Sequence, residues 1–538
     1  MQTQKISYAQ TNYFSQLVLD YLAETDKVRP FYEFPCNLQG IGKAVRQMQT
    51  HYTADMRQSL CQILAKQYHS LLPNATVEQQ LQLLAKSNTL TVTTAHQPNI
   101  FGGPLYIVYK ILATIRLCQQ LNQHFPDHHF VPIYWMGSED HDFEEINHIH
   151  LFNQKLQWQQ TKGGSVGRLG LETLDNTVQQ LLQLLGDGDN AQQIQDYIEQ
   201  SYSAADNLAT ATQLFLHQLF GEYGLLIIQQ DDSQLKQHFA PIMETELLDK
   251  ASFFLAQQTN QQLAAQQYHQ QAFARPINLF YLTDGKRERI VWNEEQQHYS
   301  AEQKQWQKNE IVNEVRQFPE RFSPNVFLRP TYQQTVLPNV VYIGGGGELA
   351  YWLQQKPIIQ HYGAFYPILL LRPSVLWIDA TTANKLQKLD ITPTKLFQPI
   401  QQIITDYVAQ NSPHELDLSR EKAQLEQLFT QIQTKATTIE PSLQDSVAAE
   451  ASKMFKSLEN LEQKLRRAEK RKHDTAIEQI QHIQQKLFPN NSLQERHDNF
   501  IPFYLKYGKD FFDTLLQYFE PLEKQFLLVI DGSKLPNY

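Results

Sequence analysis

The chain contains very little cysteine. It has three cysteines among 538 residues, Cys36, Cys61 and Cys118, and no two of them form a Cys-x-x-Cys pair. A small, odd number of dispersed cysteines argues against a disulfide framework and against a cysteine-based zinc site. We therefore expect a cytoplasmic protein with free thiols and without structural zinc.

The sequence also lacks long apolar runs and a surplus of positive charge. No stretch approaches the roughly 20 apolar residues that cross a bilayer, and residues 1–14 do not show the basic and then apolar pattern of a signal peptide. The net charge of −10 disfavours a protein that coats nucleic acid. We expect neither a membrane nor a nucleic acid as partner, and the length predicts two or three domains.

What the chain does contain is a strand–turn–helix pattern, first seen over residues 89–117. A β-prone apolar run leads into a turn rich in proline and glycine, and helical spacing of apolar residues follows. This geometry leaves free backbone N–H groups at the start of the helix, which suit a phosphate or a carboxylate. Glycine would let the backbone approach such a ligand, although it also serves ordinary turns. The candidate ligand-binding residues of this turn are His96, Gln97, Asn99, Gly102 and Gly103.

A second strand is predicted over residues 131–136, and a cluster of ionisable residues follows it. In open α/β sheets, ligands bind at the carboxyl ends of the strands. The cluster suits an amine, or Mg²⁺ held together with ATP phosphates, although acids at a helix start are also ordinary capping residues. The candidate catalytic residues are Glu139, Asp140 and His141.

A third unit of the same kind covers residues 337–356. Its strand leads into a glycine run, residues 344–347, and Glu348 stands at the start of the next helix. The candidate binding residues of the run are Gly344, Gly345 and Gly346. The run suits a phosphate or a ribose, with Glu348 accepting from the ribose hydroxyls. Slightly upstream, two further residues are candidate anchors for an anionic substrate, namely Arg329 and Tyr332.

The last third of the chain has a different pattern. Apolar residues recur at three–four spacing on both sides of Pro441, which predicts two long helices joined as a hairpin. An apolar seam through Leu458, Leu461 and Leu465 would stay wet in a monomer, so we expect a coiled coil that makes a homodimer. The expected organisation is a first core part with N-terminal helices, an insertion, a second core part, the coiled-coil hairpin, and a C-terminal segment packed on the body, over residues 1–150, 151–275, 276–411, 412–488 and 489–538.

Several of these segments carry a family resemblance. The stretches HQPNIFGGPLYIVYK, PIYWMGSEDHDFEEINH, RFSPNVFLRPTYQQTVLPNVVYIGGGGELAYW and LQERHDN closely resemble the BshC family, the cysteine-adding enzymes of bacillithiol biosynthesis. The resemblance implies an α/β fold with a Rossmann-type parallel-sheet core related to class I aminoacyl-tRNA synthetases, connecting-peptide insertions and an α-helical coiled-coil domain. It also implies ATP binding by the turn at His96, and a second nucleotide pocket at Gln494, Arg496 and Asn499.

The resemblance further implies an ATP-dependent ligase that joins L-cysteine to glucosaminyl-malate. A carboxylate is a poor electrophile and needs activation by ATP, as an acyl-adenylate or as an acyl-phosphate; the residues do not decide between the two. An acid such as Asp140 or Glu139 would hold or deprotonate the attacking amine. Two alternatives remain, a metal-dependent hydrolase that uses Glu139–Asp142 and a non-catalytic nucleotide-binding coiled-coil protein.

Overall fold

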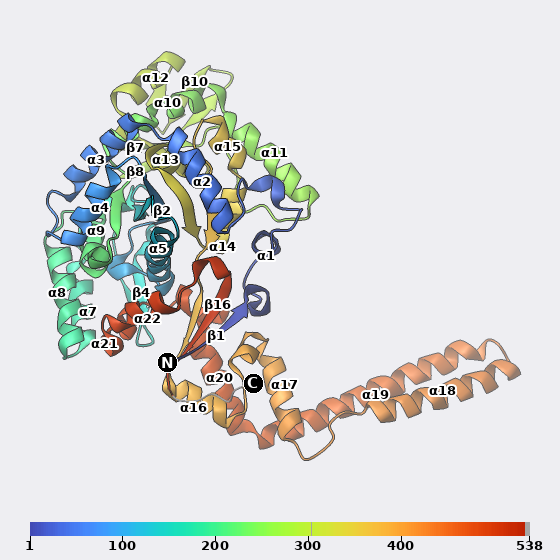
Figure 1. Cartoon of the computed structure of the whole chain (residues 1–538). Helices are drawn as coiled ribbons and strands as arrows, with labels where there is room; N and C mark the ends of the chain where they lie inside the picture. Colours follow the sequence, from blue (N-terminus) through green and yellow to red (C-terminus); the bar gives the residue numbers. More distant parts are fainter. Residues whose placement is uncertain (284, 303, 533–538) are drawn as a thin grey trace.

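The centre of the molecule is a five-stranded sheet in which all neighbouring strands run parallel (Figure 1). The computed structural model describes residues 1–283, 285–302 and 304–532. The strand order is β14-β13-β2-β3-β6. The strands are almost entirely buried, as expected for a parallel sheet covered on both faces. Their bounds are Thr89–His96 for β2, His129–Met136 for β3, Leu226–Gln229 for β6, Asn339–Gly344 for β13 and Ile368–Leu371 for β14.

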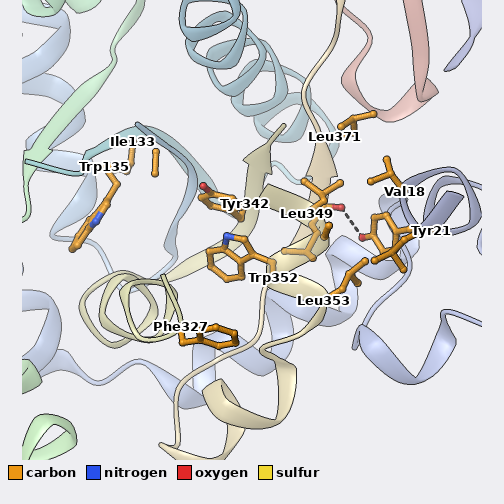
Figure 2. Close-up of a cluster of buried hydrophobic side chains, with 14 of the residues drawn as sticks. Val18, Tyr21, Ile133, Trp135, Phe327, Tyr342, Leu349, Trp352, Leu353 and Leu371 are labelled. Carbon is orange, nitrogen blue, oxygen red and sulfur yellow. Dashed lines mark hydrogen bonds between the residues drawn. The ribbon is translucent and has the colours of Figure 1, made fainter. Parts of the chain in front are cut away.

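Helices cover both faces of this sheet and divide the apolar core in two. The long helix α5 (Leu105–His124) connects β2 to β3 and is buried along most of its length, together with α2 (Leu38–His51). The opposite face carries the second core, in which Trp135 and Tyr342 of the sheet and Trp352 of a covering helix are buried (Figure 2). The helices that contribute to this second core include α1 (Gln16–Leu22), α3 (Ala54–Tyr68), α4 (Ala75–Leu84), α10 (Ser233–Asp249), α13 (Arg329–Val336), α14 (Gly346–Leu353) and α15 (Lys356–His361).

Two long insertions interrupt the sheet. The first, between β3 and β6, contains a short hairpin and four α-helices: α6 (Phe143–Ile146), β4 (His148–Leu151), β5 (Gln154–Gln157), α7 (Asp175–Leu185), α8 (Asp189–Ser203) and α9 (Leu208–Phe220). Residues 226–229 fall inside the insertion expected over 151–275, yet they form the edge strand β6, because Leu226, Ile227 and Ile228 are fully buried against the sheet.

The second insertion lies between β6 and β13. After α10 and α11 (Ala251–Ala265), the chain builds a small antiparallel sheet in the order β12-β7-β8, from Phe322–Pro324, Leu279–Thr283 and Lys286–Arg289. A second small sheet contains β9 (Val291–Asn293), β10 (His298–Ala301) and β11 (Lys304–Trp306), followed by α12 (Lys308–Gln317). Much of the segment 276–324, expected in the second core part, therefore forms separate sheets; residues 284 and 303 lie outside the described residues.

A further module joins the two ends of the chain. Strand β16 (Gln525–Ile530) pairs with β1 (Gln2–Ser7) on one side and with β15 (Val375–Ile378) on the other. Helices α16 (Ala380–Lys388), α17 (Ile400–Asn411) and α20 (Asp474–Leu487) lie beside this sheet, and α18 (Ser419–Ile439) and α19 (Leu443–Lys472) extend away from it as a hairpin (Figure 1).

The C-terminal segment returns to the body through α21 (Ile501–Tyr507) and α22 (Asp510–Tyr518). Phe511, Phe512 and Leu515 of α22 are buried in the same core as α5. Residues 533–538 of the expected C-terminal segment lie outside the described residues. In the part of the chain that the structure describes, no helix is both long and apolar enough to cross a bilayer.

Candidate active site

A cavity of about 800 Å³ lies at the carboxyl ends of β2, β3 and β13. One wall comes from the turns that follow these strands and includes His96, Gln97, Asp140, Gly345 and Glu348. The facing wall comes from the second insertion, over residues 271–280 and from strand β8. The structure thus brings together parts of all three predicted turns, because the carboxyl ends of parallel strands meet at one edge of the sheet.

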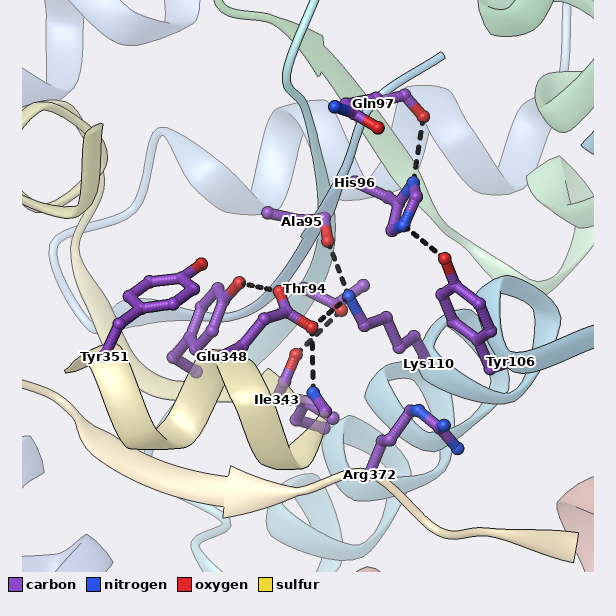
Figure 3. A network of polar contacts seen from close by, with 12 residues as sticks. Thr94, Ala95, His96, Gln97, Tyr106, Lys110, Ile343, Glu348, Tyr351 and Arg372 are labelled. Atoms are coloured by element: carbon purple, nitrogen blue, oxygen red, sulfur yellow. Dashed lines mark hydrogen bonds and ion pairs between the residues drawn. The ribbon is translucent and has the colours of Figure 1, made fainter. Parts of the chain in front are cut away.

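A buried ion pair lies at the edge of the cavity, which its carboxylate Glu348 lines (Figure 3). Lys110 of α5 is 1% exposed, pairs with the Glu348 carboxylate and donates to the Ala95 carbonyl oxygen at 2.9 Å. The same carboxylate accepts from the Tyr342 hydroxyl at 2.6 Å and from the Gly345 backbone N–H at 2.8 Å. Burial alone would raise the pKa of Glu348, but the charge and hydrogen bond of Lys110 outweigh it and lower the pKa to about 2. Glu348 therefore stays ionised.

His96 is held in the first turn between three partners, of which Figure 3 shows Gln97 and Tyr106. Its Nε2 lies 2.8 Å from the Tyr106 hydroxyl, and its Nδ1 lies 3.1 Å from Asn99 Nδ2 and 3.2 Å from the Gln97 carbonyl oxygen. Burial, followed by the nearby charge of Lys110, lowers the pKa of His96 to about 4. The imidazole is thus neutral at pH 7 and can contribute a hydrogen bond to a ligand but not a positive charge.

Three residues of the first turn serve its packing instead of lining the cavity. Asn99 is buried within the turn, where its amide also donates to the Gln97 carbonyl. Gly102 and Gly103 have positive φ values of 79° and 64°. A Cβ at Gly102 would come within 2.9 Å of the Phe500 ring, and one at Gly103 within 2.8 Å of the Asn99 Cβ. These glycines are required by close packing, which is the second of the two interpretations the sequence left open.

The third turn divides its glycines between two cavities. Gly345 and Gly347 line the main cavity, whereas Gly344 ends strand β13 and is buried. Gly346 lines an adjacent cavity of about 170 Å³, which it shares with Gly347. Only part of the predicted glycine run can therefore approach a ligand in the main cavity.

Asp140 connects the two walls of the main cavity. Its carboxylate accepts from Gln97 Nε2 at 2.7 Å and from the His141 backbone N–H at 2.7 Å, and Arg287 Nη1 lies 3.5 Å away. Burial would raise the pKa of Asp140, but hydrogen bonds from His141 and Gln97 and the charge of Arg287 hold it well below its usual range. Such a carboxylate is a weak base, so it is suited to holding a cation more than to removing a proton.

His141 lies beside Asp140 but does not line the cavity. Its ring is half exposed, and its Nδ1 lies 3.0 Å from Arg287 Nη1. Arg287, on β8, was not singled out by the sequence because its partner Asp140 is 147 residues away along the chain.

Two predicted site residues lie behind the cavity in a buried polar network. The Glu139 side chain is 1% exposed, pairs with Lys236 at 2.5 Å and accepts from Gln230 Nε2 at 2.9 Å. Tyr332 is fully buried and donates to the Gln230 carbonyl oxygen at 2.8 Å. Lys236 also pairs with Asp231 at 2.9 Å. The structure therefore separates Glu139 and Tyr332 from the residues that could touch a substrate in this cavity.

Arginines dominate the charge of the cavity. Arg329, a candidate anchor for an anionic substrate, lines it and donates to the Tyr351 hydroxyl at 2.8 Å. The arginines that line the cavity are Arg275, Arg287, Arg289, Arg329, Arg372 and Arg496, and the acids are Asp140, Glu145 and Glu348. This excess of positive charge, in a molecule whose net charge is −10, suits a ligand with several phosphates or carboxylates.

The LQERHDN segment mainly fastens the C-terminal module to the body. Gln494 exchanges hydrogen bonds with the backbone of Trp377 at 3.0 and 3.3 Å. Asn499 donates to the carbonyl oxygens of Phe101 and Gly103 at 3.0 and 2.7 Å. Both side chains are buried, whereas Arg496 lines both the main and the adjacent cavity. Of the three residues assigned to a second pocket, Arg496 alone borders these cavities.

Among residues 1–283, 285–302 and 304–532, no group of three or more His, Cys, Asp or Glu side chains is arranged to hold a metal ion.

Comparison with known proteins identifies the family. Residues 1–373 match the family model described as "Bacillithiol biosynthesis BshC, N-terminal Rossmann-like domain", and residues 375–530 match its "C-terminal coiled-coil domain". The boundary between the two lies directly before strand β15.

Relatives match over almost their whole length. A protein of Christiangramia forsetii named "Putative cysteine ligase BshC" is 39% identical over 99% of this chain and 100% of its own. Proteins of the same name from Flavobacterium johnsoniae and Flavobacterium psychrophilum are 38% and 37% identical, each over 98% of this chain and over 100% and 99% of their own lengths. The chain belongs to the BshC family of bacillithiol biosynthesis, with its Rossmann-like domain followed by its coiled-coil domain.

Proposed function

We propose that this chain is an ATP-dependent ligase that joins the carboxylate of L-cysteine to the amine of glucosaminyl-malate. The relatives are named cysteine ligases, and the observation that carries the proposal is the arginine-rich cavity at the carboxyl edge of a parallel sheet. Six arginines in one cavity suit the phosphates of ATP and the carboxylates of both other substrates.

The residues of the first wall fit ATP. Gly345 and Gly347 leave room for close approach at the start of α14, neutral His96 offers a hydrogen bond, and Arg329 supplies positive charge. Helix N-termini and arginines are recurrent phosphate-binding elements. When bound, ATP supplies the activation that turns an unreactive carboxylate into an acylating group. Mg²⁺ would enter with the nucleotide phosphates.

Asp140 is the candidate partner of the attacking amine. Its carboxylate is ionised, lies on the cavity surface and is fixed by Gln97 and Arg287. An ionised acid in this position orients an amine by a charge-assisted hydrogen bond. His141 and Glu139, the other two candidates, would then act through the position of Asp140 and not by contact with the substrate.

The coiled-coil hairpin is the candidate dimer interface. Helices α18 and α19 pack on each other, and Lys422 pairs with Glu462 across them at 2.6 Å. Leu461 and Leu465 nevertheless remain 50% and 40% exposed. A homodimer through this face would cover them.

The cysteines fit a protein that functions in the cytoplasm. Cys36, Cys61 and Cys118 are all free thiols, and Cys36 and Cys118 are buried. Free thiols are usual in a reducing compartment.

The test is ATP consumption by the purified protein, with cysteine and glucosaminyl-malate supplied together or singly. The ligase predicts consumption that needs both substrates, with the amide product identified by mass spectrometry. Hydrolysis of a substrate without ATP, together with near-stoichiometric bound metal, would instead identify the hydrolase. Nucleotide binding with no turnover under any condition would identify the non-catalytic protein.

A further inference from the structure

The second insertion presents one polar face of its small sheet to the cavity. Phe280 of β7 pairs in register with Arg289 of β8 and with Ser323 of β12. Side chains alternate along a strand, so Arg287 and Arg289 lie on the same face of β8. Phe280, Arg287 and Arg289 all line the cavity, and Arg275 joins them from the segment that precedes β7. We call Arg275, Phe280, Arg287 and Arg289 the insertion wall.

Arg287 is fully engaged by the protein. Its Nε donates to Ser323 Oγ at 3.1 Å, its Nη2 donates to the Pro324 carbonyl oxygen at 2.9 Å, and its guanidinium lies 4.0 Å from the centre of the Phe280 ring. Its remaining nitrogen faces Asp140 and His141. Arg287 therefore braces the wall against Asp140 and has little capacity left for a ligand.

Arg275 and Arg289 differ from Arg287 in this respect. Within the residues that the structure describes, neither guanidinium has a hydrogen-bond or ion-pair partner, although both line the cavity. An unpaired arginine on a convex surface is ordinary, but two in one concave site next to a braced third are a feature of anion recognition.

The backbone that carries Arg275 is fixed in place. The buried Asn278 side chain accepts from the Arg275 backbone N–H at 3.0 Å and donates to the Arg275 carbonyl oxygen at 2.8 Å. Asn278 is itself anchored, because it donates to Ser252 Oγ at 2.6 Å and accepts from Asn325 Nδ2 at 2.7 Å. This arrangement explains the Arg-Pro-Ile-Asn order of residues 275–278 and holds Arg275 at the cavity without a side-chain partner.

We propose that Arg275 and Arg289 form an oxyanion subsite that recognises the carboxylates of the malate moiety of the acceptor substrate. The inference rests on the proposed function, which supplies the acceptor. Two arguments favour carboxylates of the acceptor over phosphates of ATP. Gly345 and Gly347 belong to the turn after β13 and not to the insertion wall, and Asp140, the candidate amine partner, is bound to the insertion wall through Arg287.

In this arrangement, the amine and the carboxylates of glucosaminyl-malate contact neighbouring residues of the cavity. The amine of glucosaminyl-malate would meet Asp140 while its two carboxylates meet Arg275 and Arg289. Arg287 would set the spacing between these contacts, since it touches Asp140 and shares a strand with Arg289. An acceptor without carboxylates would keep the first contact and lose the second.

The experiment measures binding by calorimetry for the full-length wild type, Arg275→Gln, Arg289→Gln and the double variant. The probes are glucosaminyl-malate, methyl glucosaminide, which has no carboxylate, and ATP with Mg²⁺. We expect each single variant to weaken glucosaminyl-malate binding about 10- to 100-fold, the range for a hydrogen bond to a charged group. Binding of methyl glucosaminide and of ATP should change less than about twofold. Arg467→Gln, an exposed arginine on α19, is the matched control and should change nothing.

The outcomes separate this subsite from the proposed function. Weaker ATP binding with unchanged glucosaminyl-malate binding would assign the arginines to phosphate and overturn the proposal. Wild-type affinity of every variant for every probe would also overturn it, while leaving the ligase proposal in place. A wild type that does not bind glucosaminyl-malate at all would overturn both. Melting temperatures of the variants verify that each protein is folded.

Discussion

At the scale of single residues, this site depends on which charges are buried and how they are paired. Glu348 and Glu139 are both acids at the carboxyl edge of the sheet, and each pairs with a buried lysine, Lys110 or Lys236. Glu348 still borders the cavity, whereas Glu139 does not. Removing one member of a buried pair is costly because the other is left charged without a partner.

Glu348 should make stability depend on acid pH. Its pKa is about 2 in the fold against an ordinary 4.5, so its contribution is fully present above about pH 4.5 and is lost as the pH falls towards 2. We expect up to about 3 kcal/mol of unfolding free energy to disappear over this window. Urea unfolding of the wild type should show this slope, and the double variant Lys110→Met with Glu348→Gln should lack it. Parallel pH profiles of the two proteins would contradict the pairing.

Asp140 and Glu139 should respond in opposite ways to loss of charge. Asp140→Asn should lower kcat/KM for glucosaminyl-malate about 10- to 100-fold, because a charged hydrogen bond to the amine is lost. Its unfolding free energy should fall by only about 1 kcal/mol, since the carboxylate is 39% exposed and screened by water. Glu139→Gln should cost about 3 kcal/mol, because it leaves Lys236 buried with one acid fewer. Kinetics and urea unfolding of both variants check this, and full activity of Asp140→Asn would remove Asp140 from the reaction.

At the scale of elements, the hairpin of α18 and α19 has an apolar seam that its own two helices cover only in part. Leu458 is half-buried, whereas Leu461 and Leu465 are 50% and 40% exposed. Residues three and seven positions apart lie along one stripe of a helix, so the three leucines form a single seam. The exposed part of this seam remains for a second copy.

The exposed leucines Leu461 and Leu465 should determine whether the protein forms a dimer. Leu461→Glu with Leu465→Glu should convert a dimer into a monomer, because burying two carboxylates in an apolar interface is unfavourable. Light scattering at micromolar concentration measures the mass. Gln463→Glu, which places the same charge on an exposed polar position of α19, is the control and should leave the dimer intact. A monomeric wild type would contradict the prediction directly.

At the scale of the whole molecule, the ends of the chain complete the body. Strand β16 pairs with β1 and β15, and Gln494 and Asn499 fasten the same segment to Trp377 and to the turn at Gly103. The hairpin of α18 and α19, in contrast, projects from the body (Figure 1). The two parts of the C-terminal third should therefore differ in their importance for folding.

Two deletions should separate these roles. Replacing residues 419–472 with a short glycine–serine linker should give a folded monomer whose melting temperature stays within a few degrees of the wild type. Ending the chain at Phe488 should prevent folding, because it removes β16 and the buried residues of α22. Circular dichroism and calorimetric melting measure both. A folded, cooperative protein ending at Phe488 would show that the body does not need this segment.

Much of the fold could be predicted from the sequence. The three strand–turn–helix units, the parallel sheet and the coiled coil follow from local periodicity and turn residues, and the family comparison confirms the Rossmann-like and coiled-coil domains. The placement of Leu226–Gln229 in the main sheet was not predicted, because a short apolar strand carries no signal of which sheet it joins.

The sequence by itself determined where the chain turns and which polar residues follow each strand, because propensity and periodicity are local properties. Only the tertiary structure decided which of these residues share the cavity. It kept His96, Gln97 and Asp140 there and buried Glu139 and Tyr332 behind it. It also brought in Arg287 and Arg289 from a strand about 150 residues away in the chain. Such long-range pairings are set by packing and charge compensation, which no local pattern encodes.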